Sequence, residues 1–207
     1  MKPAPIYLED NAAQERIVAV LERDGIVIVP TDTLYGLSAA VSSNDGYRRI
    51  LEIKQCDGER NFLLLASSID MVDRFVCSWG CASREQLASI WPAALTGIFP
   101  SGDRCPPWAG ESIAFRVPDY PPVAEMIEKL GMPILSTSVN VKGNAPLHRI
   151  EVIRERFEAH VDLIAEARSP KQDLPSTIVD FTRAKPFVVR QGSYPWPSSG
   201  AENPSKS

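Results

Sequence analysis

Hydrophobic positions near the start of the chain predict a helix followed by a buried strand. Residues 11–24 place apolar side chains at helical spacing, with Asn11 as the expected N-cap and Gly25 as the stop. Residues 26–29 then form an uninterrupted Ile/Val run. Such a run is typical of a strand covered on both faces, as in the sheets of α/β proteins.

Helical and strand patterns continue to alternate up to residue 192. Further helices are predicted over 44–54 with Asn44 or Asp45 as cap, over two short stretches within 70–92, and over 121–131 and 150–160. Further strands are predicted over 62–66, 95–100, 112–118, 132–138, 161–167, 176–181 and 186–192. This alternation predicts the α/β class, with a single three-layer domain built on a twisted mixed β-sheet.

Three apolar runs are each followed by a polar cluster. PTDTLYG follows IVIV, SVNVKG follows PILSTS, and RQG follows PFVV. Because ligands bind at the carboxyl ends of strands in open α/β sheets, we expect these clusters to meet in one cleft at that edge. Taken singly, each cluster is more typical of turn and capping groups than of ligand-binding groups.

The residue types in these clusters favour binding of anions. Hydroxyls, amides, Lys and Arg without a nucleophile–His pair suit phosphates and carboxylates. The chain contains no Walker loop, no GxGxxG motif and no GxSxG elbow. The sequence therefore predicts an anionic-ligand cleft of an unfamiliar kind.

Composition narrows the function classes further. The chain has 207 residues, enough for one sizeable domain, and a net charge of −4, which excludes the broad positive field of a general nucleic-acid coat. The net charge does not exclude a local basic groove. The four cysteines form no CxxC pair and lie far from His148 and His160, so no metal site is expected. No apolar run reaches the ~18 residues of a membrane span, and we expect a cytoplasmic protein without a membrane partner.

Six motifs, in this order, resemble the Sua5/YciO/YrdC family. They are PTDTLYGL, a lysine after the second helix, FRVP, STSVN, LPSTIVD and VVRQG. The resemblance covers residues 6–193 and implies a YrdC-like domain, while residues 194–207, rich in Pro, Ser and Gly, are predicted to form a flexible tail.

The resemblance implies an L-threonylcarbamoyladenylate synthase. Such an enzyme joins L-threonine, bicarbonate and ATP, the last with Mg²⁺, and releases pyrophosphate. Its product serves the t6A37 modification of tRNA together with other proteins of that pathway. Some family members bind double-stranded RNA. Neither chemical step requires a protein nucleophile, so no catalytic side chain is expected, only positioning of the substrates.

Site residues are carried over from the matching motifs. Those implied for threonine are Thr31, Thr33, Tyr35, Arg116, Ser138 and Ser176. Those implied for the nucleotide are Lys54, Arg60, Ser112, Asn140 and Arg190. Asp32 and Thr177 lie within the same motifs, and for them a role in capping turns is equally open.

One motif departs from the synthase pattern. Synthases carry KxRPxxxPL, whereas this chain has KQCDGERNF, with Cys56 in place of the arginine and Asn61-Phe62 in place of Pro-Leu. Cysteine cannot replace a bidentate guanidinium, and we expect Arg60 to reach the same anion. The change resembles the YciO-type branch. The alternative function is therefore a paralogue that binds nucleotide or double-stranded RNA without synthase activity.

Overall fold

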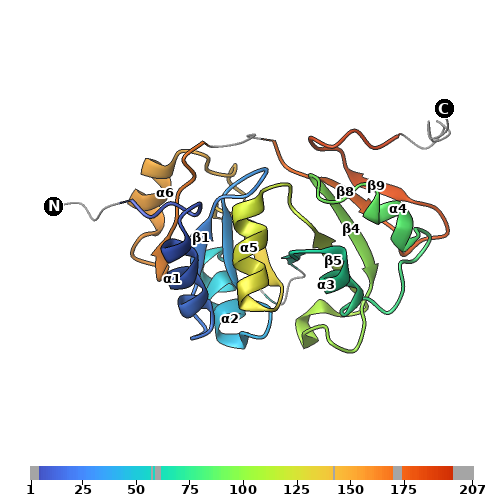
Figure 1. The fold of residues 1–207 in the computed structure, drawn as a ribbon, viewed down its shortest axis with the longest axis horizontal. Coiled ribbons are helices and arrows are strands. Elements are labelled where there is room, and N and C mark those ends of the chain that lie inside the picture. The colour runs from blue at the N-terminus through green and yellow to red at the C-terminus, as the bar shows by residue number, and fades with distance from the viewer. Residues whose placement is uncertain (1–4, 57, 59–61, 142, 170–173, 198–207) are drawn as a thin grey trace.

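The computed structural model describes residues 5–56, 58, 62–141, 143–169 and 174–197 (Figure 1). The helices are α1 (Asn11–Leu21), α2 (Asn44–Ile53), α3 (Ile69–Asp73), α4 (Arg84–Ala88), α5 (Pro121–Leu130) and α6 (Ile150–Phe157), with a 3-10 turn at Pro107–Ala109. The strands are β1 (Val27–Val29), β2 (Gly36–Ala40), β3 (Leu63–Leu65), β4 (Leu95–Pro100), β5 (Ser112–Arg116), β6 (Ile134–Ser138), β7 (Leu163–Ile164), β8 (Thr177–Asp180) and β9 (Phe187–Arg190).

All strands of the described residues join one mixed sheet in the order β7-β1-β2-β6-β3-β5-β4-β8-β9. Three pairs are parallel, β1 with β7, β3 with β5 and β4 with β8, and the remaining pairs are antiparallel. The register places Gly36 opposite Ser138 and Leu65 opposite Arg116. The predicted mixed sheet is confirmed.

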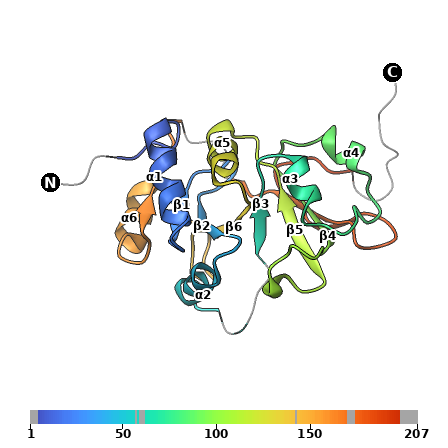
Figure 2. The same cartoon turned by 60° about the horizontal axis from the view of Figure 1, so that its bottom comes forward.

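Helices lie on both sides of this sheet. α1 and α5 run side by side on one side, and Figures 1 and 2 show α2 on the other, where it packs against β2. The residues of β1 are fully buried, as expected for a strand covered on both faces. The α/β class and the layered arrangement predicted from the sequence are thus confirmed.

Strand β2 is the main element that the sequence analysis missed. Its sequence is GLSAA, and Gly, Ser and Ala have low strand propensity. The strand is nevertheless buried throughout, and it lies between β1 and β6, away from both edges of the sheet. Tertiary position decides its conformation here.

The predicted helix caps were also wrong, by one residue for Asn11 and Asn44 and by two for Asp45. The N-cap of α2 is Ser43, whose hydroxyl accepts a hydrogen bond from the Gly46 amide. The N-cap of α1 is Asp10, whose side chain makes no capping bond, and Asn11 is already helical. A Ser one position earlier satisfies the free amides of the first turn better than the polar residues within it.

The described part of the tail contacts the domain. The Tyr194 carbonyl accepts hydrogen bonds from the Thr177 hydroxyl at 2.6 Å and from the Gln191 amide at 2.7 Å. Trp196 packs edge-to-face against Phe181, with ring centroids 5.6 Å apart. The composition of the tail did not indicate these contacts. The division at residue 194 stays a prediction, and residues 198–207 lie outside the described part.

Candidate functional site

A cleft with a volume of ≈ 580 Å³ lies across one face of the sheet. Its described lining comes from strands and connecting loops and includes no helical residue. From β5 it takes Ser112, Ala114 and Arg116, alternate residues that share one face of a strand. The expectation of a site at the carboxyl edge was therefore too narrow, because the cleft extends over the face itself.

The structure brings most of the predicted site residues together in this cleft. Those that line it are Thr31, Thr33, Tyr35, Ser112, Arg116, Ser138, Ser176 and Arg190. Lys54 and Asn140 lie behind the lining and are connected to it through Ser138. Arg60 lies outside the described residues. The polar clusters that follow separate apolar runs thus converge as predicted.

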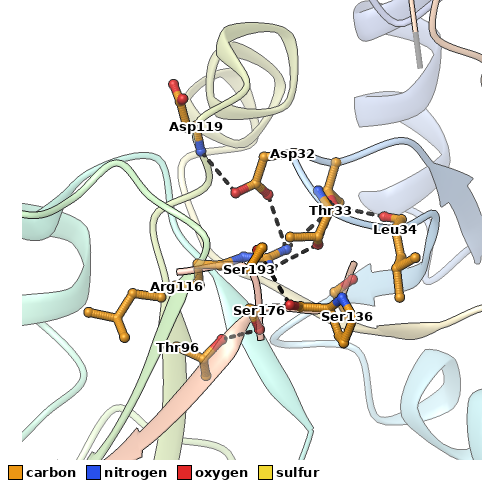
Figure 3. Close-up of polar contacts among 12 residues, drawn as sticks. Asp32, Thr33, Leu34, Thr96, Arg116, Asp119, Ser136, Ser176 and Ser193 are labelled. Atoms are coloured by element: carbon orange, nitrogen blue, oxygen red, sulfur yellow. Dashed lines mark hydrogen bonds and ion pairs between the residues drawn. The ribbon is translucent and has the colours of Figure 1, made fainter. Parts of the chain in front are cut away.

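The guanidinium of Arg116 is the buried charge at the base of the cleft. It is 4% exposed, and it donates to the Thr33 hydroxyl at 2.9 Å and to the Thr31 hydroxyl at 3.4 Å (Figure 3). Thr31 in turn donates to the Leu34 carbonyl at 2.7 Å. Since that bond uses the only hydroxyl hydrogen of Thr31, Thr33 is the donor in the 3.2 Å contact between the two threonines.

Electrostatics make the cleft attractive to anions. Burial lowers the pKa of Arg116, and the carboxylate of Asp32 acts against that effect. Burial also lowers the pKa of Arg190, and the positive charge of Arg116 lowers it further. An arginine stays protonated at neutral pH. The two guanidiniums therefore repel each other, and an anion between them would relieve that repulsion.

Arg190 is held against the loop before β8. Its Nε and one terminal nitrogen donate to the Ser176 carbonyl at 3.2 and 2.9 Å. The Ser176 hydroxyl is 2.9 Å from the hydroxyl of Thr96, a buried residue of β4 that also lines the cleft. Thr96 was not among the predicted site residues, because the sequence shows it only as a single hydroxyl within the apolar run LTGIFP.

Lys54 fixes the chain that follows β6. Its Nζ atom donates to the carbonyls of Ser138 and Asn140 at 2.8 and 3.1 Å, and to Asn140 Oδ1 at 2.7 Å. Asn140 Oδ1 also accepts from the Ser138 hydroxyl at 2.7 Å, and its amide donates to the Asn144 carbonyl at 2.6 Å. The side chains of Lys54 and Asn140 are thus engaged with protein groups rather than turned to the cleft.

Thr177 has the structural role that its motif left open. The Thr177 hydroxyl accepts from the Gly192 amide at 2.9 Å and donates to Tyr194, so it organises the turn after β9. Tyr35 lines the cleft, as implied for threonine binding. Burial raises the pKa of its phenol, and the backbone of Ala167 acts against that effect.

Comparison with known proteins identifies the family. The family model Sua5_yciO_yrdC, described as "Telomere recombination", matches residues 19–192. The chain belongs to the Sua5/YciO/YrdC family. Five of the six family motifs contribute residues to the lining of the cleft, the exception being the lysine after the second helix.

Curated relatives match over nearly their whole length. A threonylcarbamoyl-AMP synthase from Klebsiella pneumoniae is 30% identical over 193 residues, which are 89% of this chain and 100% of the relative. The one from Thiobacillus denitrificans is 30% identical over 84% of this chain and 94% of its own. The one from Yersinia enterocolitica is 28% identical over 89% of this chain and 98% of its own.

Solved structures of the Sua5/YciO/YrdC family share the fold. E. coli YciO superposes with a TM-score of 0.80 at 26% identity and covers 88% of this chain and 90% of its own. P. abyssi Sua5 complexed with L-threonine superposes with a TM-score of 0.81 at 23% identity over 88% of this chain. This chain spans 55% of the length of that Sua5.

Proposed function

We propose that this chain is an L-threonylcarbamoyladenylate synthase, which forms threonylcarbamoyl-AMP and pyrophosphate from L-threonine, bicarbonate and ATP. The observation that carries the proposal is the meeting of Arg116 and Arg190 in one hydroxyl-lined cleft. No His or Cys is among its described lining residues. Such a cleft suits a reaction that needs positioning and charge neutralisation rather than an attacking side chain.

The amino acid is proposed to lie over Arg116. The guanidinium would pair with the substrate carboxylate, since charge-assisted contacts between arginine and carboxylate are strong and directional. Thr33 contacts Arg116 and Ser176 contacts Arg190, and both hydroxyls would be available to bind the hydroxyl or amine of threonine. Thr31 and Tyr35 would shape the pocket: the Thr31 hydroxyl is already used within the protein, and Tyr35 lines the cleft.

The nucleotide is proposed to lie between Arg190 and the end of β6. The threonine amine captures bicarbonate with loss of water, or CO2 with loss of a proton, to give a carbamate. A carbamate oxygen then attacks the α-phosphorus while pyrophosphate leaves. Arg190 and Ser112 would contact the phosphates, and Ser138 would face the junction of the two substrates. Lys54 and Asn140 would then hold the Ser138 segment in place or exchange one of their bonds for a phosphate oxygen.

Mg²⁺ is part of this proposal as a companion of ATP. Among the described residues, no cluster of His, Cys, Asp or Glu suited to a metal is present, and no carboxylate lines the cleft. These residues fit an ion that is held mainly by phosphate oxygens and water, which is how Mg²⁺ usually enters nucleotide sites. There it would offset phosphate charge.

The proposal places the product in the tRNA t6A37 modification pathway, with proteins of that pathway and tRNA as partners and the cytoplasm as location. Among the described residues, no helix is long and apolar enough to cross a membrane. The full-length match to relatives named threonylcarbamoyl-AMP synthase supports the assignment.

Release of pyrophosphate tests the function. Purified chain with ATP and Mg²⁺ should release pyrophosphate only when both L-threonine and bicarbonate are present. Arg116→Ala should abolish the release while far-UV circular dichroism shows that the fold survives. Absence of release above background with all substrates present would discard the proposal.

A second function is favoured by Cys56. This residue replaces the arginine of the synthase motif, and its thiol lies 3.8 Å from the Lys54 carbonyl. The alternative is a YciO-like paralogue that binds nucleotide or double-stranded RNA without synthase activity. In that case duplex RNA binding should weaken steeply as salt rises, because phosphate contacts release counterions. Undetectable or salt-independent binding would remove the RNA alternative.

A further inference from the structure

Asp32 and Arg116 form a buried ion pair beneath the cleft. Asp32 Oδ1 is 3.3 Å from a terminal nitrogen of Arg116, and the two side chains are 5% and 4% exposed. Asp32 is not among the residues that line the cleft, so a bound ligand would meet Arg116 and not the carboxylate. A buried guanidinium without a counter-charge is costly, and Asp32 is the carboxylate paired with this one.

The carboxylate is itself held from a different element. Asp32 Oδ2 accepts a hydrogen bond from the Asp119 amide at 3.3 Å, in the segment between β5 and α5 (Figure 3). Among the described residues, Asp32 accepts no hydrogen bond from the amides of its own turn. A turn-capping role therefore does not describe it. The carboxylate instead bridges the PTDT loop and the segment directly after Arg116.

The hydrogen-bond inventory of Arg116 shows why this bridge matters. Its terminal nitrogens donate to the hydroxyls of Thr33 and Thr31, whereas the contact with Asp32 Oδ1 is an ion pair without hydrogen-bond geometry. Its Nε atom is buried and has no hydrogen-bond partner among the described residues. The orientation of the guanidinium thus depends on contacts to one three-residue stretch, and Asp32 supplies the only charge among them.

We propose that Asp32 is a positioning residue that holds the Arg116 guanidinium in the orientation needed for the substrate carboxylate. The inference rests on the proposed function, because it assigns that carboxylate to the amino-acid substrate. It predicts that loss of the Asp32 charge weakens amino-acid binding selectively. ATP binding, which is assigned to the other side of the cleft, should be affected far less.

The test is a double-mutant cycle with Asp32→Asn and Arg116→Gln. Asparagine keeps the size and an oxygen acceptor for the Asp119 amide but removes the charge. Asp32→Asn should weaken L-threonine binding by about 10-fold to 100-fold, the loss typical of a misplaced binding group, and change ATP binding by less than about 2-fold. In the Arg116→Gln background the same change should have no further effect on L-threonine, since residues acting through one contact are not additive.

Thermal unfolding supplies a readout that is independent of substrate. Asp32→Asn should lower the melting temperature, because it leaves Arg116 charged and unpaired, and adding Arg116→Gln should recover part of that loss. A residue that merely supports the fold would lower threonine and ATP affinity alike and show additive melting shifts. Either result overturns the positioning role.

The two proposals can fail separately. If the wild-type chain binds L-threonine and Asp32→Asn binds it equally well, the role of Asp32 is overturned while the function stands. If the wild-type chain binds ATP but no L-threonine under any condition, the proposed function is overturned, and the positioning role falls with it.

Discussion

The Nζ atom of Lys54 lies 2.7 Å from Oδ1 of Asn140, and this contact joins the end of α2 to the chain that leaves β6. Lys54 is 8% exposed, so its ammonium depends on protein acceptors rather than on water. The same Asn140 oxygen accepts from Ser138, a residue of the cleft. The position of the cleft wall at Ser138 is thereby coupled to a buried lysine.

Substitution of Asn140 should cost stability as well as activity. Asn140→Ala removes one acceptor of a buried ammonium and the partner of Ser138, and we expect a loss of about 1–3 kcal/mol in the free energy of unfolding. Urea denaturation measures it. Asn144→Ala is the matched control, because Asn144 is exposed and contributes its backbone carbonyl, and it should change stability by less than about 0.5 kcal/mol. Equal effects of the two variants would contradict the coupling.

A side chain at Gly36 should obstruct the cleft. A Cβ atom added there would overlap with the hydroxyl of Ser136, another residue of the lining. Gly36→Ala is therefore expected to destabilise the protein by about 1–3 kcal/mol through overpacking and to weaken L-threonine binding. Adding Ser136→Gly should restore much of the stability. If Gly36→Ala alone binds threonine as the wild type does, the cleft is roomier than described.

The hydroxyl of Thr96 should matter through Ser176. Thr96→Val keeps the shape of the side chain but removes the 2.9 Å hydrogen bond between the two hydroxyls. Because both groups are buried, we expect a loss of about 1–3 kcal/mol in stability and weaker L-threonine binding in calorimetry. Thr96→Ser retains the hydroxyl and should bind threonine normally. Equal losses in both variants would contradict the role of the hydrogen bond, because Thr96→Ser retains the hydroxyl that forms it.

Restoring the arginine of the family motif tests the two candidate functions against each other. Cys56→Arg supplies a guanidinium beside Lys54, and we expect it to raise synthase turnover if Arg60 compensates only partly. Cys56→Lys adds a positive charge without the planar, bidentate donors of a guanidinium, and it should raise turnover less. Pyrophosphate release measures both. Unchanged turnover in Cys56→Arg would show that another residue already makes the anion contact of this arginine, or that the contact is not needed.

The sequence predicted the fold wherever apolar patterning was strong. The Ile/Val run of β1 and the amphipathic helix α5 with Gly131 as its stop were placed correctly, because their burial follows directly from local composition. β2 was missed since its small residues carry little strand preference, and only its neighbours β1 and β6 make it a strand. Long-range pairing of this kind leaves no local signal.

The sequence predicted which residues lie together in the cleft, but not the contacts that these residues make with one another. Family motifs pointed to Thr33, Arg116 and Arg190, and the structure places all of them in one cleft. The ion pair of Asp32 with Arg116 joins residues far apart in the chain, and no spacing rule reveals it. Thr96 was missed because a single hydroxyl in a strand looks the same whether it faces a ligand or the core.

Calorimetric titration of L-threonine into the chain, with and without ATP and Mg²⁺, tests most directly whether the cleft holds an amino acid beside a nucleotide. We predict saturable binding with one site per chain, strengthened by ATP and lost in Arg116→Ala. Absence of heat with both ligands present, or binding that survives Arg116→Ala unchanged, would contradict the account.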